Sequence, residues 1–262
     1  MTPGTMSIGG RRLETAWWGP TPDAAPTLVL LHEGLGCVAL WRDIPERLAA
    51  ATGFGVFAYS RFGYGQSDPA PLPRPMRYMH DEALDILPKV LDAAYIEHAI
   101  TIGHSDGGSI AAIHAGGTRD PRVAAIVTIA AHFFVEDLNI ASIAKLRGEY
   151  ETTDLRVRLG RYHADPDNAF RGWAGAWLDP QFRNFDIVGY LPDIAVPMLA
   201  LQGEADPYGS EAQLRVLDGH VRSSLETRLI PGAKHAPHLE AKDITVPLLA
   251  AFARAHSGDF AI

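Results

Sequence analysis

Short apolar runs of strand length recur along this chain, and stretches with helical spacing lie between them. Four of these runs span residues 27–32, 54–60, 99–102 and 122–130. A continuous apolar run of this length is typical of a strand that is buried on both faces of a parallel sheet. Because strands and helices alternate here, the pattern predicts an α/β fold with helices on both faces of the sheet.

Two of the intervening helices have recognisable limits. The first begins near Trp41 and stops at Gly53, a residue that commonly ends helices. The second is amphipathic and runs from about residue 76 to 96. Pro88 should kink this second helix or disturb one of its turns, because proline has no amide hydrogen to donate to the preceding turn.

Further strands are expected toward both ends of the chain. Residues 6–19 predict a hairpin that turns at Gly9 and Gly10. The strand pattern returns at residues 196–202 and 225–230, before a closing helix. Together with the four central runs, these segments predict a mostly parallel sheet of eight strands.

The alternation stops between residues 136 and 190, where the pattern is mostly helical and rich in aromatic residues. We interpret residues 136–190 as a helical cap inserted into a core formed by residues 1–135 and 191–262. A peripheral helical patch is the alternative, but aromatic density in an insertion that follows a strand favours a roof over a substrate. The aromatic residues are Tyr150, Tyr162, Phe170, Trp173, Trp177, Phe182 and Phe185.

A serine lies at the junction of a strand and a helix, in the sequence Gly-His-Ser-Asp-Gly at residues 103–107. Glycines two positions on either side allow the strand and helix to close around Ser105, which exposes its hydroxyl. The amide N–H of Asp106, at the start of the helix, could then stabilise an oxyanion. The pattern predicts a nucleophile elbow, with His104 packed beneath the nucleophile.

A serine hydroxyl needs an imidazole to accept its proton and a carboxylate to orient that imidazole. Ligands of open parallel sheets lie beyond the carboxyl ends of the strands, and loops there supply Asp206 and His235. We therefore predict the catalytic residues Ser105, Asp206 and His235. Rivals are Glu136 or Asp137 for the acid and His238 for the base.

The composition limits the classes of partner. The formal charge is −8, no run of Lys or Arg occurs, and no apolar segment is long enough to span a membrane, so we expect neither nucleic acid nor membrane as a partner. The single cysteine, Cys37, and the absence of a secretory signal pattern favour a cytoplasmic location. The scattered histidines form no metal motif, and no pattern indicates an oligomeric state.

The motifs taken together resemble the α/β-hydrolase fold family over essentially the whole chain. The resemblance is carried by the His32 loop, residues 60–67, the elbow at 103–107, Gly203-Glu-Ala-Asp206 and Gly232-Ala-Lys-His235. It implies an α/β-hydrolase sheet with an inserted cap, and the family's chain order of serine, acid and histidine. It does not specify the substrate, because this fold hosts many chemistries.

The resemblance also implies the second oxyanion donor. Family loops usually read His-Gly-x, and alignment on His32 and Trp41 makes the backbone of Gly34 the donor. Glu33 replaces the usual glycine here. We expect Glu33 either to be a surface charge or to pair with Arg61, and we favour the pair.

Asp106 is open to two readings. Its carboxylate could complement the dipole of the helix, or it could bind a cationic group of the substrate. The Ser-Asp-Gly-Gly elbow and the Lys-His-x-x-His-Leu ending resemble biphenyl hydrolase-like esterases, which cleave amino-acid esters. Candidate substrate-binding residues are Glu33, Trp41, Phe133, Trp173, Trp177 and His238.

The sequence thus predicts a cofactor-free serine hydrolase that binds a small molecule and cleaves a carboxylic ester through an acyl-enzyme. The same catalytic residues could instead hydrolyse a thioester, a lactone or a C–C bond. A non-catalytic ligand receptor on this fold is the alternative from another class.

Overall fold

The strands form one sheet of eight, in the order β1-β2-β4-β3-β5-β6-β7-β8. In this computed structural model, which describes residues 1–258, β2 runs antiparallel to β1 and β4, and every other neighbouring pair is parallel. The expected mostly parallel sheet is therefore confirmed. The strands are β1 (Thr2–Ile8), β2 (Arg11–Trp18), β3 (Thr27–Leu31), β4 (Gly55–Tyr59), β5 (Ala99–His104), β6 (Val123–Ile129), β7 (Met198–Gly203) and β8 (Leu225–Ile230).

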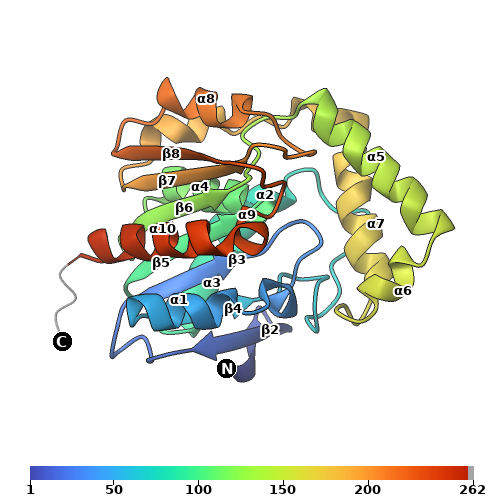
Figure 1. Cartoon of the computed structure of the whole chain (residues 1–262). Coiled ribbons are helices and arrows are strands. Elements are labelled where there is room, and N and C mark those ends of the chain that lie inside the picture. Colours follow the sequence, from blue (N-terminus) through green and yellow to red (C-terminus); the bar gives the residue numbers. More distant parts are fainter. Residues whose placement is uncertain (259–262) are drawn as a thin grey trace.

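Helices cover both faces of the sheet (Figure 1). The α-helices are α1 (Ile44–Thr52), α2 (Tyr78–Asp81), α3 (Leu87–Ala93), α4 (Asp106–Thr118), α5 (Asp137–Thr152), α6 (Leu155–Leu159), α7 (Pro166–Trp177), α8 (Ala212–Asp218), α9 (Pro237–Glu240) and α10 (Lys242–Ala255). Shorter or wider helical turns are η1 (Val38–Trp41), η2 (Glu82–Ile86), η3 (Pro180–Asn184) and η4 (Val188–Asp193). No helix among the described residues is long and apolar enough to cross a membrane.

The residues of β3 divide between two apolar layers because successive side chains of a strand point to opposite faces. Leu28 and Leu30 pack in the layer that contains α1 and α10, whereas Val29 and Leu31 pack in the layer that contains α3 and α4. Each of these four side chains is almost completely buried. This burial on both faces is the reason that the strand reads as a continuous apolar run.

The segment expected to form one helix from residue 76 to 96 is three shorter pieces. Helix α2 is followed by the π-helical turn η2, and α3 then begins with Pro88 in its first turn. A proline in an uninterrupted helix would remove a hydrogen bond and clash with the carbonyl four residues earlier, and the wider turn avoids this clash. The expected kink at Pro88 is therefore a change of helix type just before it.

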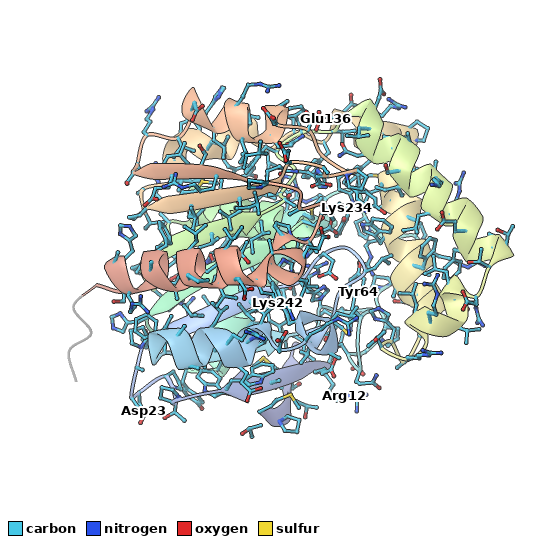
Figure 2. The ribbon with its side chains drawn as sticks, viewed as in Figure 1. Arg12, Asp23, Tyr64, Glu136, Lys234 and Lys242 are labelled. Atoms are coloured by element: carbon cyan, nitrogen blue, oxygen red, sulfur yellow. The ribbon has the colours of Figure 1, made fainter. Side chains whose placement is uncertain are left out.

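The chain between β6 and β7 forms α5, α6 and α7, which lie beside the carboxyl ends of the parallel strands (Figure 1). Tyr64 and Lys234 lie between the sheet and these helices, whereas Asp23 lies at the opposite end of the sheet (Figure 2). Residues from the loops that follow β3, β5, β6, β7 and β8 meet residues of α5 and α7 around one cavity.

Candidate active site

Ser105 lies in the sharp turn between β5 and α4. Its backbone has φ 53° and ψ −119°, a conformation that side-chain-bearing residues rarely adopt. A Cβ on Gly103 would collide with the backbone of Gly107, and one on Gly107 would collide with the backbone of Leu31. The glycines at 103 and 107 therefore permit the close approach of strand and helix that this turn requires.

Ser105, His235 and Asp206 form one hydrogen-bonded series. The Oγ atom of Ser105 is 3.0 Å from Nε2 of His235, and Nδ1 of His235 is 2.9 Å from both carboxylate oxygens of Asp206. Because the carboxylate only accepts, Nδ1 carries the hydrogen, and Nε2 is left to accept from the serine hydroxyl. The three residues come from loops after β5, β7 and β8, which the parallel sheet brings to one edge.

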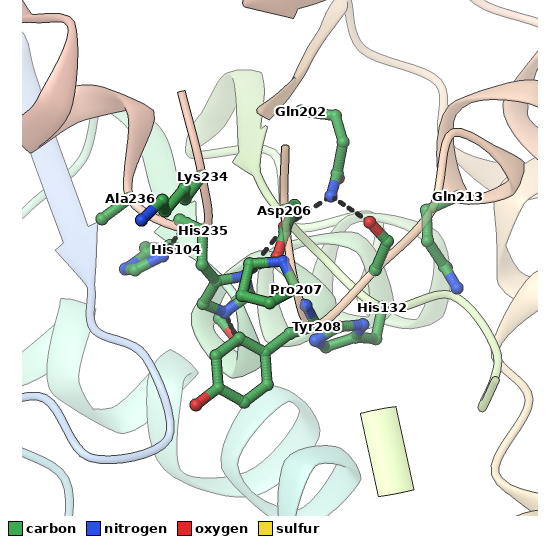
Figure 3. A network of polar contacts seen from close by, with 12 residues as sticks. His104, His132, Gln202, Asp206, Pro207, Tyr208, Gln213, Lys234, His235 and Ala236 are labelled. Atoms are coloured by element: carbon green, nitrogen blue, oxygen red, sulfur yellow. Dashed lines mark hydrogen bonds and ion pairs between the residues drawn. The ribbon is translucent and has the colours of Figure 1, made fainter. Parts of the chain in front are cut away.

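Asp206 is fixed by two further donors. The side-chain amide of Gln202 donates to Oδ2 at 2.6 Å, and the amide N–H of Tyr208 donates to Oδ1 at 2.8 Å. Figure 3 shows these groups around the carboxylate. Burial would raise the pKa of Asp206, but the hydrogen bonds from His235 and Tyr208 outweigh it, so the pKa is lowered and the carboxylate stays ionised. Sequence analysis missed Gln202, although an amide in an otherwise apolar strand is a visible signal.

The rival candidates occupy other positions. The side chain of Glu136 accepts hydrogen bonds from Ser210 and Gln213 and caps the start of α5, and Asp137 pairs with Arg183 at the protein surface. His238 is buried, with its ring centre 5.2 Å from that of Trp41. None of these three candidates takes part in the series that includes Ser105.

Gly34 and Asp106 both line the cavity beside Ser105. No described residue accepts a hydrogen bond from the amide of Gly34. Arg61 holds the loop that carries Gly34, because its guanidinium donates to the carbonyls of His32 and Glu33. Gly34 must be glycine, because a Cβ there would collide with the indole of Trp173.

The expected ion pair between Glu33 and Arg61 is wrong. The carboxylate of Glu33 instead lies 3.4 Å from Nδ1 of His104, while the guanidinium of Arg61 lies 3.8 Å from the carboxylate of Asp106. Burial would raise the pKa of Glu33, but the hydrogen bond and positive charge of His104 lower it well below its usual range. Arg61 reaches Glu33 only at its backbone carbonyl, because the side chain of Glu33 turns back over its own loop toward His104.

The carboxylate of Asp106 is almost fully buried and already has partners. It accepts hydrogen bonds from the hydroxyl of Tyr78 at 2.6 Å and from the indole N–H of Trp177 at 3.3 Å, with Arg61 as its counter-ion. Burial, followed by the negative charge of Asp106, raises the pKa of Tyr78 well above its usual value, so Tyr78 remains a donor. Arg61 therefore already supplies, beside Asp106, the positive charge that a cationic substrate would bring.

A cavity of about 460 Å³ opens over Ser105. Three of the candidate substrate-binding residues line it, namely Glu33, Trp173 and Trp177. Its other lining residues are Gly34, Leu35, Ser105, Asp106, His132, Ile143, Leu146, Tyr208 and His235. The wall is thus mostly apolar or aromatic, and Ser105 and His235 also line it.

The other three candidates, Trp41, Phe133 and His238, do not line this cavity. Trp41 is buried in the layer between the sheet and α1, and its ring packs against that of His238. Phe133 is buried in the core on the other face of the sheet. Its neighbour His132 lines the cavity instead, a residue that sequence analysis missed although it lies in the loop that follows β6.

No group of three or more described His, Cys, Asp or Glu residues is arranged to hold a metal ion. The histidines near Ser105 pack against one another instead: the ring centre of His104 is 5.1 Å from that of His235 and 4.6 Å from that of His238. His104 and His235 form hydrogen bonds with protein groups of the surrounding loops, whereas Nδ1 of His238 is buried without a partner among the described residues.

Several solved structures share this fold. A carboxylesterase of the thaumarchaeon Nitrososphaera gargenis is 18% identical and has a TM-score of 0.77, with 98% of this chain and 100% of that chain covered. The enol-lactonase of Burkholderia xenovorans LB400 is 20% identical with a TM-score of 0.73, covering 95% and 99% of the two chains. A proline iminopeptidase of Mycobacterium smegmatis is 18% identical with a TM-score of 0.69, covering 98% and 99%. At these identities the similarity establishes the fold alone.

No curated protein matches the chain in sequence. The family model described as the alpha/beta hydrolase fold matches residues 26–162, which is more than half of the 262 residues. This match includes the elbow and agrees with the observed sheet. The chain therefore belongs to the α/β-hydrolase fold family.

Proposed function

We propose that this protein is a serine hydrolase that cleaves a carboxylic ester of a small or medium-sized substrate. The observation that carries the proposal is the hydrogen-bonded series in which Ser105 lies 3.0 Å from Nε2 of His235, whose other nitrogen faces Asp206. A carboxylate, an imidazole and a hydroxyl in this order are the groups that activate a serine nucleophile. The open cavity above Ser105 supports a small-molecule substrate.

In the proposed reaction, Ser105 attacks the ester carbonyl while His235 accepts the hydroxyl proton. The negative charge that develops on the carbonyl oxygen is stabilised by the amide N–H groups of Gly34 and Asp106. His235 then donates its proton to the leaving alkoxide, and the alcohol departs from the acyl-enzyme. Water, deprotonated by His235, attacks the acyl group and releases the acid and Ser105.

We also propose that residues 136–190 act as a cap over this site. Trp173 and Trp177 come from α7 and line the cavity. Their rings would exclude water from the acyl-enzyme and define the shape of the substrate. This assigns the aromatic segment to substrate binding and the remainder of the chain to catalysis.

Hydrolysis of short p-nitrophenyl esters tests the proposal. We expect the wild type to turn these esters over and Ser105→Ala to lose at least about a thousandfold in kcat, since removing the nucleophile disables the whole series. Ser223→Ala, in the loop before β8, is the matched serine control and should retain activity. Turnover of thioesters, lactones or diketones but not of esters would reassign the reaction, and turnover of none would favour a ligand receptor.

A further inference from the structure

The imidazole of His132 is a polar group of the cavity wall that the proposed reaction does not use. It follows β6 and is 3% exposed. Its ring is nearly parallel to that of His235, with centres 5.8 Å apart, and meets the ring of Trp177 edge to face at 5.2 Å. The ring is therefore rigidly held beside the proposed catalytic base.

The neighbouring amide of Asn139 determines which nitrogen of His132 carries the hydrogen. The backbone N–H of Glu136 donates to Oδ1 of Asn139 at 2.5 Å, which fixes the orientation of the amide. Nδ2 of Asn139 then donates to the carbonyl of Tyr208 and lies 3.2 Å from Nδ1 of His132. Since Nδ2 can only donate, Nδ1 of His132 accepts, and the hydrogen of the neutral ring is on Nε2.

This Nε2–H group has no acceptor within residues 1–258. Nε2 is not sealed from solvent, and the ring lines the cavity. Burial, followed by the positive charge that His235 can carry, lowers the pKa of His132 to about 3. The ring is thus an uncharged donor at neutral pH, and an occupant of the cavity is the partner within its reach.

We propose that His132 is a specificity-determining residue whose Nε2–H binds an uncharged oxygen acceptor of the substrate, a keto or ether oxygen distinct from the reacting ester group. This inference rests on the proposed function. In the proposed reaction, the amides of Gly34 and Asp106 donate to the oxygen of the reacting carbonyl. Because β5 lies between β3 and β6 in the sheet, His132 lies on the other side of Ser105 from Gly34. The acceptor therefore lies on another arm of the substrate.

An anionic acceptor does not fit this site. The carboxylate of Glu33 is ionised and belongs to the cavity wall, and His132 supplies no positive charge. A substrate without an acceptor would displace water from the Nε2–H group without replacing its hydrogen bond, which costs binding free energy. A site built to hydrogen-bond one group of a substrate discriminates against the analogue that lacks it.

Matched ester pairs test the proposal. We would measure kcat/KM for p-nitrophenyl 4-oxopentanoate against 4-methylpentanoate, and for 5-oxohexanoate against 5-methylhexanoate, in which a methyl-bearing carbon replaces the keto group. We expect the ratio of keto to methyl ester to fall about fivefold to tenfold in His132→Phe at one chain length or both, the scale of one lost hydrogen bond. Comparing ratios cancels differences in solvation and in intrinsic reactivity between the esters.

His238→Phe is the matched control, because it replaces a buried histidine that does not line the cavity. Its keto-to-methyl ratio should equal that of the wild type. An unchanged ratio in His132→Phe at both chain lengths, or an equal fall in His238→Phe, would overturn the proposal. If the folded wild type hydrolyses neither ester, the proposed function itself is contradicted.

A measurement that needs no turnover distinguishes failure of the His132 proposal from failure of the proposed function. In Ser105→Ala labelled with ¹⁵N-histidine, His132 should show a protonated Nε2 and an unprotonated Nδ1. The Nε2 signal should shift on addition of methyl 4-oxopentanoate but not of methyl 4-methylpentanoate. A hydrogen on Nδ1, or equal shifts with both esters, would reject the donor role whatever the enzyme hydrolyses.

Discussion

The carboxylate of Glu33 faces the imidazole of His104, with Oε2 3.4 Å from Nδ1. The other nitrogen of His104 lies 2.7 Å from the backbone carbonyl of His235 and donates to it. His104, the residue that precedes Ser105, thus connects the loop of Gly34 to the loop of His235. The carboxylate and the carbonyl are both acceptors, so each ring nitrogen of His104 faces a group to which an N–H could donate.

We predict that Glu33→Gln lowers kcat/KM about fivefold to tenfold, because a neutral amide holds His104 less strongly and displaces the Gly34 loop. The side chain of Glu33 is 28% exposed, which limits the effect. A double-mutant cycle of Glu33→Gln with His104→Phe should show coupling in kcat/KM. Additive losses would mean that the pair does not position the loop.

Asp106→Asn should destabilise the fold by about 3 kcal/mol, because removing a buried carboxylate leaves its cation without a counter-charge. Here the cation is Arg61, which is 3% exposed. Urea unfolding of both proteins at pH 7 measures the difference. Equal free energies of unfolding would show that Arg61 is compensated by other groups.

The same contacts change the expectation for amino-acid esters. Since Arg61, Tyr78 and Trp177 already occupy the carboxylate of Asp106, Asp106→Asn should leave the ratio of kcat/KM for an α-amino ester to that for its des-amino analogue unchanged. A tenfold or larger preference for the amino ester that disappears in Asp106→Asn would restore the role of Asp106 as a cation site.

His132 should make the protein less stable in mild acid. Its pKa is about 3 in the folded state against 6.5 for an ordinary histidine, so between these values the unfolded chain binds a proton that the folded protein does not. Its contribution is fully present above pH 6.5 and is lost as the pH falls. At pH 5 the loss is about 2 kcal/mol relative to pH 7.

Urea unfolding at pH 7 and pH 5 measures this contribution when wild type and His132→Phe are compared. The decrease between the two pH values should be about 2 kcal/mol smaller in the variant. Other buried histidines, such as His32, whose pKa burial lowers well below its usual value, remain in both proteins and cancel. Equal decreases would mean that His132 is protonated in the fold.

Much of the fold could be predicted because its signals are local. The four buried strands are continuous apolar runs, and the Gly-x-Ser-x-Gly turn needs glycines at 103 and 107 for reasons of backbone contact alone. The π-helical turn before Pro88 could not be predicted, since the apolar spacing of a π turn and a kinked α-helix differ little over a few residues.

The direction of side chains in the loops could not be predicted from the sequence. Adjacent residues His132 and Phe133 point to opposite environments, and only the packing of the loop after β6 decides which one meets the cavity. The partner of Glu33 likewise depends on how its side chain turns over its loop. Charge alone did not distinguish Arg61 from His104 as the partner of the Glu33 carboxylate.

Ser105 and His235 should act as a unit. We expect His235→Ala to lower kcat by at least about a thousandfold and the double variant with Ser105→Ala to lose little more, because the second substitution disables a series that is already broken. Esterase assays on the three variants measure this. Near-normal activity in His235→Ala together with loss in His238→Ala would reassign the base.

The most direct test of the central claim is the site at which a fluorophosphonate reacts. The wild type, treated with the reagent and digested, should carry a single adduct on Ser105 in peptide mass spectra, because among residues 1–258 only this serine lies within hydrogen-bonding distance of His235. His235→Ala should react far more slowly. An adduct on another serine, or equal labelling of Ser105 in His235→Ala, would contradict the assignment of Ser105 as a nucleophile activated by His235.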